Sequence, residues 1–200
     1  KIDIVHARSR APAWSCLWAC FFSRKKFVTT FHGTYNFSNK LKLFYNSVMV
    51  RSKLTIAGSN FIFNHINENY NKYLKFSKNK LMVVFRGINL EYFNSKRLSE
   101  EKTNSLAQLW NINKKNFIIL LPGRLTRWKG QEMFITALNL LAQKYNKSNF
   151  HAVILGSNQG REFYSKKLSL LVERYRLDKR ITFVKNCKEM PLAYELADIA

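Results

Sequence analysis

Seven short apolar runs, each followed by a segment with helical periodicity, constrain the fold of this chain more than any other feature. The runs lie at residues 2–5, 27–31, 54–57, 81–85, 117–121, 152–155 and 181–184. Their apolar residues are nearly continuous rather than alternating, which is typical of strands covered on both faces. Residues 131–143 and 160–176 place apolar side chains on one helical face. This alternation predicts right-handed βαβ units and therefore an α/β fold with parallel, doubly wound sheets.

A stretch without clear periodicity interrupts this alternation. Residues 86–94 follow neither a strand nor a helix pattern, and a helix-like segment at 99–110 precedes a new strand at residue 117. We therefore predict two Rossmann-like domains: residues 1–90 form part of the first, residues 91–115 a linker and connecting helix, and residues 116–200 the first part of the second. Both ends of the sequence lie in apolar segments rather than polar, frayed ones, so we expect an internal piece of a longer chain, with both domains incomplete.

The composition excludes a disordered or loop-dominated chain. Hydrophobic residues make up 46% of the sequence, which includes 16 Phe, so the chain can bury a core. Lys and Arg number 34 against 12 Asp and Glu, a net charge of +22. This excess predicts an anionic partner among nucleic acid, a membrane surface and a phosphorylated substrate. Nucleic acid ranks last, because the sequence has no zinc finger, basic zipper or aromatic RNP-like strand.

The cysteines and the longest apolar stretch bear on the compartment. Cys16, Cys20 and Cys187 cannot form a disulfide framework and include no C-x-x-C pair, which fits a reducing, cytoplasmic environment. The apolar stretch at residues 11–22 is shorter than the ~20 residues that a membrane-spanning helix needs. We interpret it as a buried helix. The four histidines are scattered along the sequence, so we predict no metal site.

The most informative segment covers residues 117–130 and reads FIILLPGRLTRWKG. A buried strand ends at Gly123, a short loop carries Arg124 and Lys129, and a helix begins after Gly130. Ligands bind at the carboxyl ends of parallel strands, and the amide groups of a helix N-terminus attract phosphate. An arginine and a lysine could together neutralise a diphosphate. The loop is not a Walker A motif, because Gly130 stands where Ser or Thr would hold Mg²⁺. Its spacing alone fits a solvated basic turn equally well.

The segment GRLTRWKG resembles the signature loop of family-4 (group 1) glycosyltransferases of the GT-B fold. Further segments, in order along almost the whole chain, are similar to that family. They are DIVHARSRAPAW at 3–14, TTFHGTY at 29–35, AGSNFI at 57–62, RGINLEYF at 86–93, AVILG at 152–156 and MPLAYELAD at 190–198. The family also carries a Glu-x7-Glu region and a first strand with a glycine-rich loop, and both lie outside this sequence.

The resemblance implies an acceptor-side domain within residues 1–90 and a nucleotide-sugar-binding domain within residues 116–200. It implies transfer of a sugar from a UDP- or GDP-sugar with retention of anomeric configuration, without a metal or a cofactor. Arg124 and Lys129 match residues that hold the diphosphate and stabilise its departure, and His32 matches a residue that contacts the transferred sugar. These three are the predicted catalytic residues. The predicted nucleotide-sugar site further contains Gly33, Gly123 and Gly156.

The resemblance also implies a cell-envelope glycan or a lipid-linked acceptor, as in lipopolysaccharide biosynthesis. Residues 1–67 contain ten Lys and Arg but one acid, Asp3, and the segment at 40–53 combines an apolar face with basic ends. Core packing is the simpler explanation of that face, and contact with an anionic membrane, on the cytoplasmic face of the inner membrane, is the alternative. For the whole chain, the alternative to an enzyme is an inactive remnant or a module that binds nucleotide diphosphate without turnover.

Overall fold

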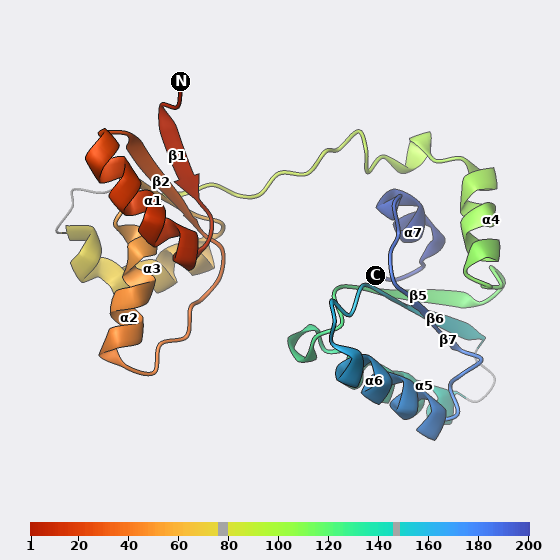
Figure 1. Cartoon of the computed structure of the whole chain (residues 1–200). Helices are drawn as coiled ribbons and strands as arrows, with labels where there is room; N and C mark the ends of the chain where they lie inside the picture. The colour runs from red at the N-terminus through yellow and green to blue at the C-terminus, as the bar shows by residue number, and fades with distance from the viewer. Residues whose placement is uncertain (76–79, 146–148) are drawn as a thin grey trace. The chain divides into compact units, whose positions relative to one another are not determined.

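The computed structural model describes residues 1–75, 80–145 and 149–200. The chain divides into two compact units, Lys1–Ile88 and Asn89–Ala200, and each is described here by itself (Figure 1). All seven predicted strands are present, and every strand pairing in the two sheets is parallel. The predicted α/β fold with parallel sheets is therefore confirmed.

The first unit is built on a four-stranded sheet in the order β1-β2-β3-β4. Its strands are β1 (Ile4–Ala7), β2 (Lys26–Phe31), β3 (Leu54–Ala57) and β4 (Lys80–Val83). Its helices are α1 (Arg10–Ser23), α2 (Lys40–Asn46), the 3-10 turn η1 (Ser47–Val50) and α3 (Asn60–Lys75). A single hydrophobic cluster joins α1, η1 and α3 to the sheet, with Phe31, Met49 and Tyr70 fully buried.

The second unit is built on a three-stranded sheet in the order β5-β6-β7. Its strands are β5 (Phe117–Pro122), β6 (Phe150–Leu155) and β7 (Ile181–Val184). Its helices are η2 (Ser95–Arg97), α4 (Glu100–Leu109), η3 (Arg127–Lys129), α5 (Gln131–Lys144), α6 (Glu162–Arg174) and α7 (Met190–Leu196). Figure 1 shows α5 and α6 on one face of the sheet and α4 and α7 on the other.

Strand β6 shows why the second sheet needs helices on both faces. Every residue of β6 is buried. Ala152 and Ile154 belong to the cluster under α5 and α6, whereas Val153 and Leu155 belong to the cluster under α4 and α7. Because successive strand side chains point to opposite faces, a continuous apolar run can be buried only in a sheet covered on both sides. The doubly wound arrangement predicted from such runs is present in this unit.

The first unit departs from that expectation. Its hydrophobic cluster lies on one face of the sheet, and residues of the opposite face, such as Ile4 and Met82, are half-exposed or more. The helices α1 and α3 pack into the same cluster, so the described residues leave the second face without a helical layer. Within the described residues, helices therefore cover the strands of this unit on one face. The first strand also begins two residues later than predicted.

Two apolar segments are less buried than we predicted. Helix α1 turns Ala13 and Cys20 toward the core, but Trp18, Phe21 and Phe22 project from the other side, and Phe22 is 78% exposed. The interpretation of residues 11–22 as a buried helix is therefore wrong for half of that helix. An apolar stretch that surrounds a helix can bury only the side that faces the sheet.

The segment at 40–53 is also only partly buried. Val48 and Met49 are fully buried in η1, whereas Leu41 is 80% exposed and Phe44 and Tyr45 are also exposed. The reason is that α2 ends at Asn46 and continues as a 3-10 turn, so the predicted apolar face does not stay on one side. Core packing thus explains the second half of the segment but not the first. Among the described residues, no helix is long and apolar enough to cross a membrane.

Candidate functional site

The predicted phosphate loop lies at the carboxyl edge of the second sheet. Strand β5 ends at Pro122, the chain forms the 3-10 turn η3, and Gly130 takes a left-handed conformation with φ +75° immediately before α5 begins. Gly130 caps α5 without a side-chain hydrogen bond, so unpaired amide groups face the loop. Glycine adopts such a backbone without a steric penalty, which explains the residue at this position.

A close contact between two glycines holds this loop against the end of β6. Gly123 donates its amide to the Leu155 carbonyl (2.8 Å), and Leu125 donates to the Ser157 carbonyl (3.0 Å). A Cβ placed on Gly156 would lie 2.1 Å from the carbonyl oxygen of Gly123. Gly156 is therefore required by backbone packing, a role that we did not predict from the sequence.

Lys129 folds back over the same turn. A Cβ placed on Gly123 would lie 3.7 Å from Cδ and 3.8 Å from Cγ of Lys129, so the aliphatic part of the lysine runs across the bare glycine. The Lys129 side chain remains largely exposed, as does that of Arg124. The turn thus presents two cations beside the start of α5.

Arg124 is held by two glutamines that we did not predict. The buried amide of Gln131 donates to the Arg124 carbonyl (3.0 Å), and the Tyr164 hydroxyl donates to the Gln131 side-chain oxygen (3.4 Å). The guanidinium itself donates to the Gln159 side-chain oxygen (3.2 Å). The hydrogen bond from Gln131 fixes the backbone of the loop, and the bond to Gln159 orients the cation without neutralising it.

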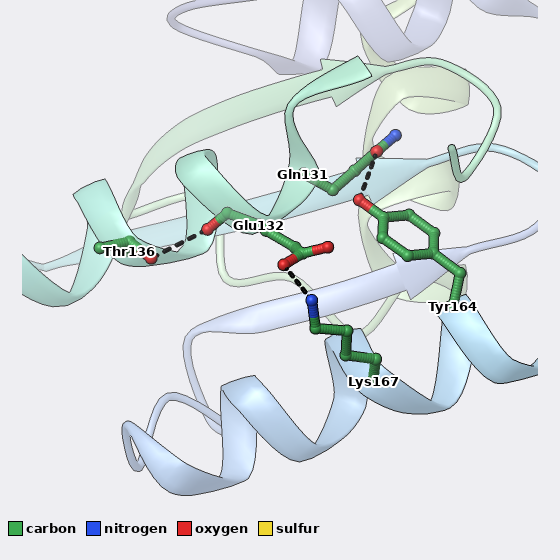
Figure 2. A network of polar contacts seen from close by, with 5 residues as sticks. All are labelled: Gln131, Glu132, Thr136, Tyr164 and Lys167. Carbon is green, nitrogen blue, oxygen red and sulfur yellow. Dashed lines mark hydrogen bonds and ion pairs between the residues drawn. The ribbon is translucent and has the colours of Figure 1, made fainter. Parts of the chain in front are cut away.

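The nearby acid is paired with a cation. Glu132 lies in the first turn of α5 and accepts a hydrogen bond from the Lys167 ammonium at 2.5 Å, while the Thr136 hydroxyl donates to its backbone carbonyl. Figure 2 shows this pair together with the Gln131–Tyr164 contact. Because Lys167 balances the carboxylate, the charge of the loop stays positive.

His32 lies at the corresponding edge of the first sheet, directly after β2. Arg8 donates from Nε to Nε2 of His32 (3.1 Å), and Nη2 of Arg86 lies 2.6 Å from its Nδ1. Partial burial lowers the pKa of His32, and the charges of Arg86, Arg8 and His6 lower it further. The imidazole is therefore neutral near pH 7. Its neighbour Gly33 has no atom within 4 Å of a Cβ built on it, so local packing does not demand a glycine there.

Two family models match the chain in succession. The model of Glycosyltransferase Family 4 matches residues 1–92, and the model of Glycosyl transferases group 1 matches residues 102–200. The chain belongs to the group 1 glycosyltransferases. The first match ends at residue 92, within the segment without clear periodicity. None of the curated proteins matches this chain.

Several solved structures share this fold. A glycosyltransferase from Rickettsia africae ESF-5 is 34% identical with a TM-score of 0.82, and the match covers 99% of this chain and 50% of that one. Anabaena Alr3699/HepE, solved in complex with UDP and glucose, is 20% identical with a TM-score of 0.83 over 98% and 52% of the two chains. A second HepE structure, in complex with UDP-glucose, is 21% identical with a TM-score of 0.82 over 98% and 52%. The chain thus spans about half the length of the solved chains that it matches.

The structure gathers four of the six predicted site residues in the second unit. Gly123, Arg124, Lys129 and Gly156 meet at the ends of β5 and β6, whereas His32 and Gly33 follow β2 in the first unit. Arg8 and Arg86, which contact His32, were not among the residues predicted from the sequence. The signal that could have identified them is their position shortly after a predicted strand. Among the described residues, no cluster of three or more His, Cys, Asp or Glu could hold a metal ion.

Proposed function

We propose that this protein transfers a sugar from a nucleotide diphosphate donor, a UDP- or GDP-sugar, and that its second unit binds the diphosphate. One observation carries the proposal: the side chain of Lys129 lies over the bare backbone of Gly123, next to Arg124 and to the start of α5, where Gly130 provides no side-chain cap. Amide groups, a guanidinium and an ammonium at one strand end are suited to a diphosphate. The complexes of HepE with UDP and UDP-glucose support this assignment.

In the proposed reaction, the protein supplies the charge that the leaving diphosphate needs. Arg124 and Lys129 neutralise the negative charge that grows on the diphosphate as the bond to the sugar breaks, so a metal ion is not required for this step. His32 and Gly33 contact the transferred sugar, and Gly123 and Gly156 let the backbone approach the donor. Transfer with retention of anomeric configuration belongs to the same proposal.

The acceptor that we propose is a cell-envelope glycan or a lipid-linked sugar, as in lipopolysaccharide biosynthesis, on the cytoplasmic face of the inner membrane. Exposed apolar side chains support a peripheral membrane contact. Leu41 projects from α2 between Lys40 and Lys42, and the three exposed aromatic side chains of α1 precede a basic run at 24–26. Exposed apolar and basic residues side by side favour an anionic bilayer.

Calorimetric titration with UDP, GDP and ADP, followed by a transfer assay with the matching sugar nucleotide, tests the proposal. We expect R124A/K129A to lose at least about 3 kcal/mol of binding free energy, since hydrogen bonds to charged groups contribute ~1.5–3 kcal/mol each. K166A, which removes an exposed lysine of α6, is the matched control and should bind normally. Equal affinity of the double variant and the wild type would refute the assigned roles.

The alternative is a module that binds nucleotide diphosphate without turnover, an idea prompted by the half-length coverage of the solved relatives. Binding that depends on Arg124 and Lys129, without sugar transfer to any envelope glycan or lipid-linked acceptor and without hydrolysis of the sugar nucleotide, would favour this alternative. Transfer that R124A/K129A abolishes would exclude it.

A further inference from the structure

Three basic side chains converge at the carboxyl edge of the first sheet. Arg8 follows β1, His32 follows β2, and Arg86 comes three residues after β4. Parallel pairing aligns these strand ends, because Ala7 pairs with Thr29 and Ala57 pairs with both Phe31 and Val83. Arg86 reaches His32 past the end of β3, where its Nε lies 4.0 Å from a Cβ built on Gly58. Such an edge is where parallel α/β sheets bind ligands.

The hydrogen bonds within this group cannot all be satisfied at once. Both arginines are donors only, and a neutral imidazole has one accepting nitrogen and one N–H. When Nε2 accepts from Arg8 at 3.1 Å, Nδ1 carries the proton and points at Nη2 of Arg86, 2.6 Å away. The other tautomer produces the same conflict with Arg8. One arginine therefore always faces an N–H group instead of an acceptor.

The first unit also lacks an internal counter-ion for this group. Residues 1–88 contain two acids, Asp3 and Glu68. Asp3 precedes β1 and so lies toward the opposite end of that strand from Arg8, and Glu68 lies within α3. Among the side chains that the structure describes, neither acid forms an ion pair with Arg8 or Arg86. Converging cations with a surplus donor and no carboxylate are suited to an external oxyanion.

We propose that Arg8, His32 and Arg86 form a binding site for a phosphate-class oxyanion on the first unit. An oxyanion oxygen placed between Arg86 and His32 would accept from the guanidinium and from the imidazole N–H together, which removes the donor–donor conflict. We choose a phosphorylated acceptor as the source of the oxyanion. That choice rests on the proposed function, whereas oxyanion binding itself does not.

The test is a titration of the 200-residue protein with inorganic phosphate, followed through the imidazole NMR signals of His32. The signals are assigned with H32Q. We expect a saturable shift and a raised pKa of His32 in the complex, because a bound anion favours the imidazolium against Arg8, Arg86 and His6. R8Q and R86Q should each weaken phosphate binding about tenfold. R24Q, which removes an exposed arginine at the end of α1, should bind as the wild type does, and the signals of His151 should stay unchanged.

An absent response of His32, or equal phosphate affinity of R8Q, R86Q and the wild type, would overturn the proposal. R86K keeps the positive charge of residue 86 but not the planar guanidinium. We expect R86K to bind phosphate more weakly than the wild type and more tightly than R86Q. The NMR spectrum of each variant shows whether it is folded, so that unfolding of R86Q is distinguished from loss of the binding site.

Further arms distinguish the sources of the oxyanion. A response to glycerol 3-phosphate that persists in R124A/K129A assigns the site to a phosphorylated acceptor. A response of His32 to UDP but not to glycerol 3-phosphate would contradict the choice of a phosphorylated acceptor. Failure of the proposed function is seen separately, as absent UDP binding in calorimetry while His32 still responds to phosphate.

Discussion

The backbone of Gly156 lies so close to Gly123 that a methyl group on Gly156 would meet the Gly123 carbonyl oxygen at 2.1 Å. The contact joins the end of β6 to the loop that carries Arg124 and Lys129. Any side chain at position 156 would push this loop away from the sheet, because backbone atoms cannot yield as a flexible side chain can. The geometry of the proposed diphosphate site thus depends on a residue that need not touch the ligand.

We therefore expect G156A to destabilise the second unit by about 1–3 kcal/mol and to weaken UDP binding. Hydrogen exchange of the β6 amides under increasing urea measures the stability of this unit specifically. G87A is the matched control, since a Cβ built on Gly87 has no atom within 4 Å and should leave the exchange of β6 unchanged. If the second unit of G156A is as stable as that of the wild type, the loop can move away from Gly156 without a loss of stability, and the expectation is wrong.

Gln131 provides a second test of how the loop is held. Q131L removes one of the two donors to the Arg124 carbonyl, the other being the Thr126 hydroxyl, and it removes the acceptor of the buried Tyr164 hydroxyl. We expect a loss of about 1–3 kcal/mol in the free energy of unfolding and weaker UDP binding through misplacement of Arg124. Q143L makes the same exchange at an exposed position of α5 and should be neutral. Equal unfolding midpoints for the two variants would argue against a supporting role of Gln131.

We expect His151 to make the stability of the second unit depend on pH. Burial lowers the pKa of His151 from its usual 6.5, and its Nε2 lies 2.8 Å from the Thr182 hydroxyl. A base with a lowered pKa in the folded state is protonated more readily when unfolded, so its contribution is fully present above about pH 6.5 and is lost as pH falls toward the folded pKa. We expect β6 amides to lose protection between pH 7.5 and 5.5 after correction for intrinsic exchange rates. The β6 amides of H151Q should lose less protection than those of the wild type over this pH range. An equal loss in the two proteins would show that other groups cause the pH dependence.

The exposed side of α2 allows a test of the membrane proposal. L41S/K42Q removes one apolar and one basic side chain from the surface of α2. We expect binding to phosphatidylglycerol vesicles to fall about tenfold, since each basic residue near an anionic surface contributes ~1 kcal/mol and the leucine adds apolar burial. L170S/K166Q makes the matched change on exposed residues of α6 and should bind like the wild type. Binding in sedimentation assays that resists added salt, or that both double variants lose equally, would contradict the proposal.

Sequence patterns were sufficient for the elements that depend on local chemistry. Unbroken apolar runs such as the one at β6 identified buried parallel strands, and the change from strand to helix around Gly130 located the loop with Arg124 and Lys129. Local patterns did not predict burial where it depends on which other element of the fold packs against an apolar side chain. Phe22 and Leu41 are as apolar as core residues, but both are exposed, because periodicity shows that a helix has an apolar side and not what packs against it.

By itself, the amino-acid order determined the parallel α/β architecture and the basic loop after β5, since each follows from residue types within a few turns or one strand of one another. Tertiary structure decided which distant residues meet. The contact of Gly123 with Gly156, the hydrogen bond from Arg124 to Gln159, and the convergence of Arg8 and Arg86 on His32 all join residues that follow different strands. Such meetings follow from the order and register of strands in a sheet, which a single sequence does not encode in any local pattern.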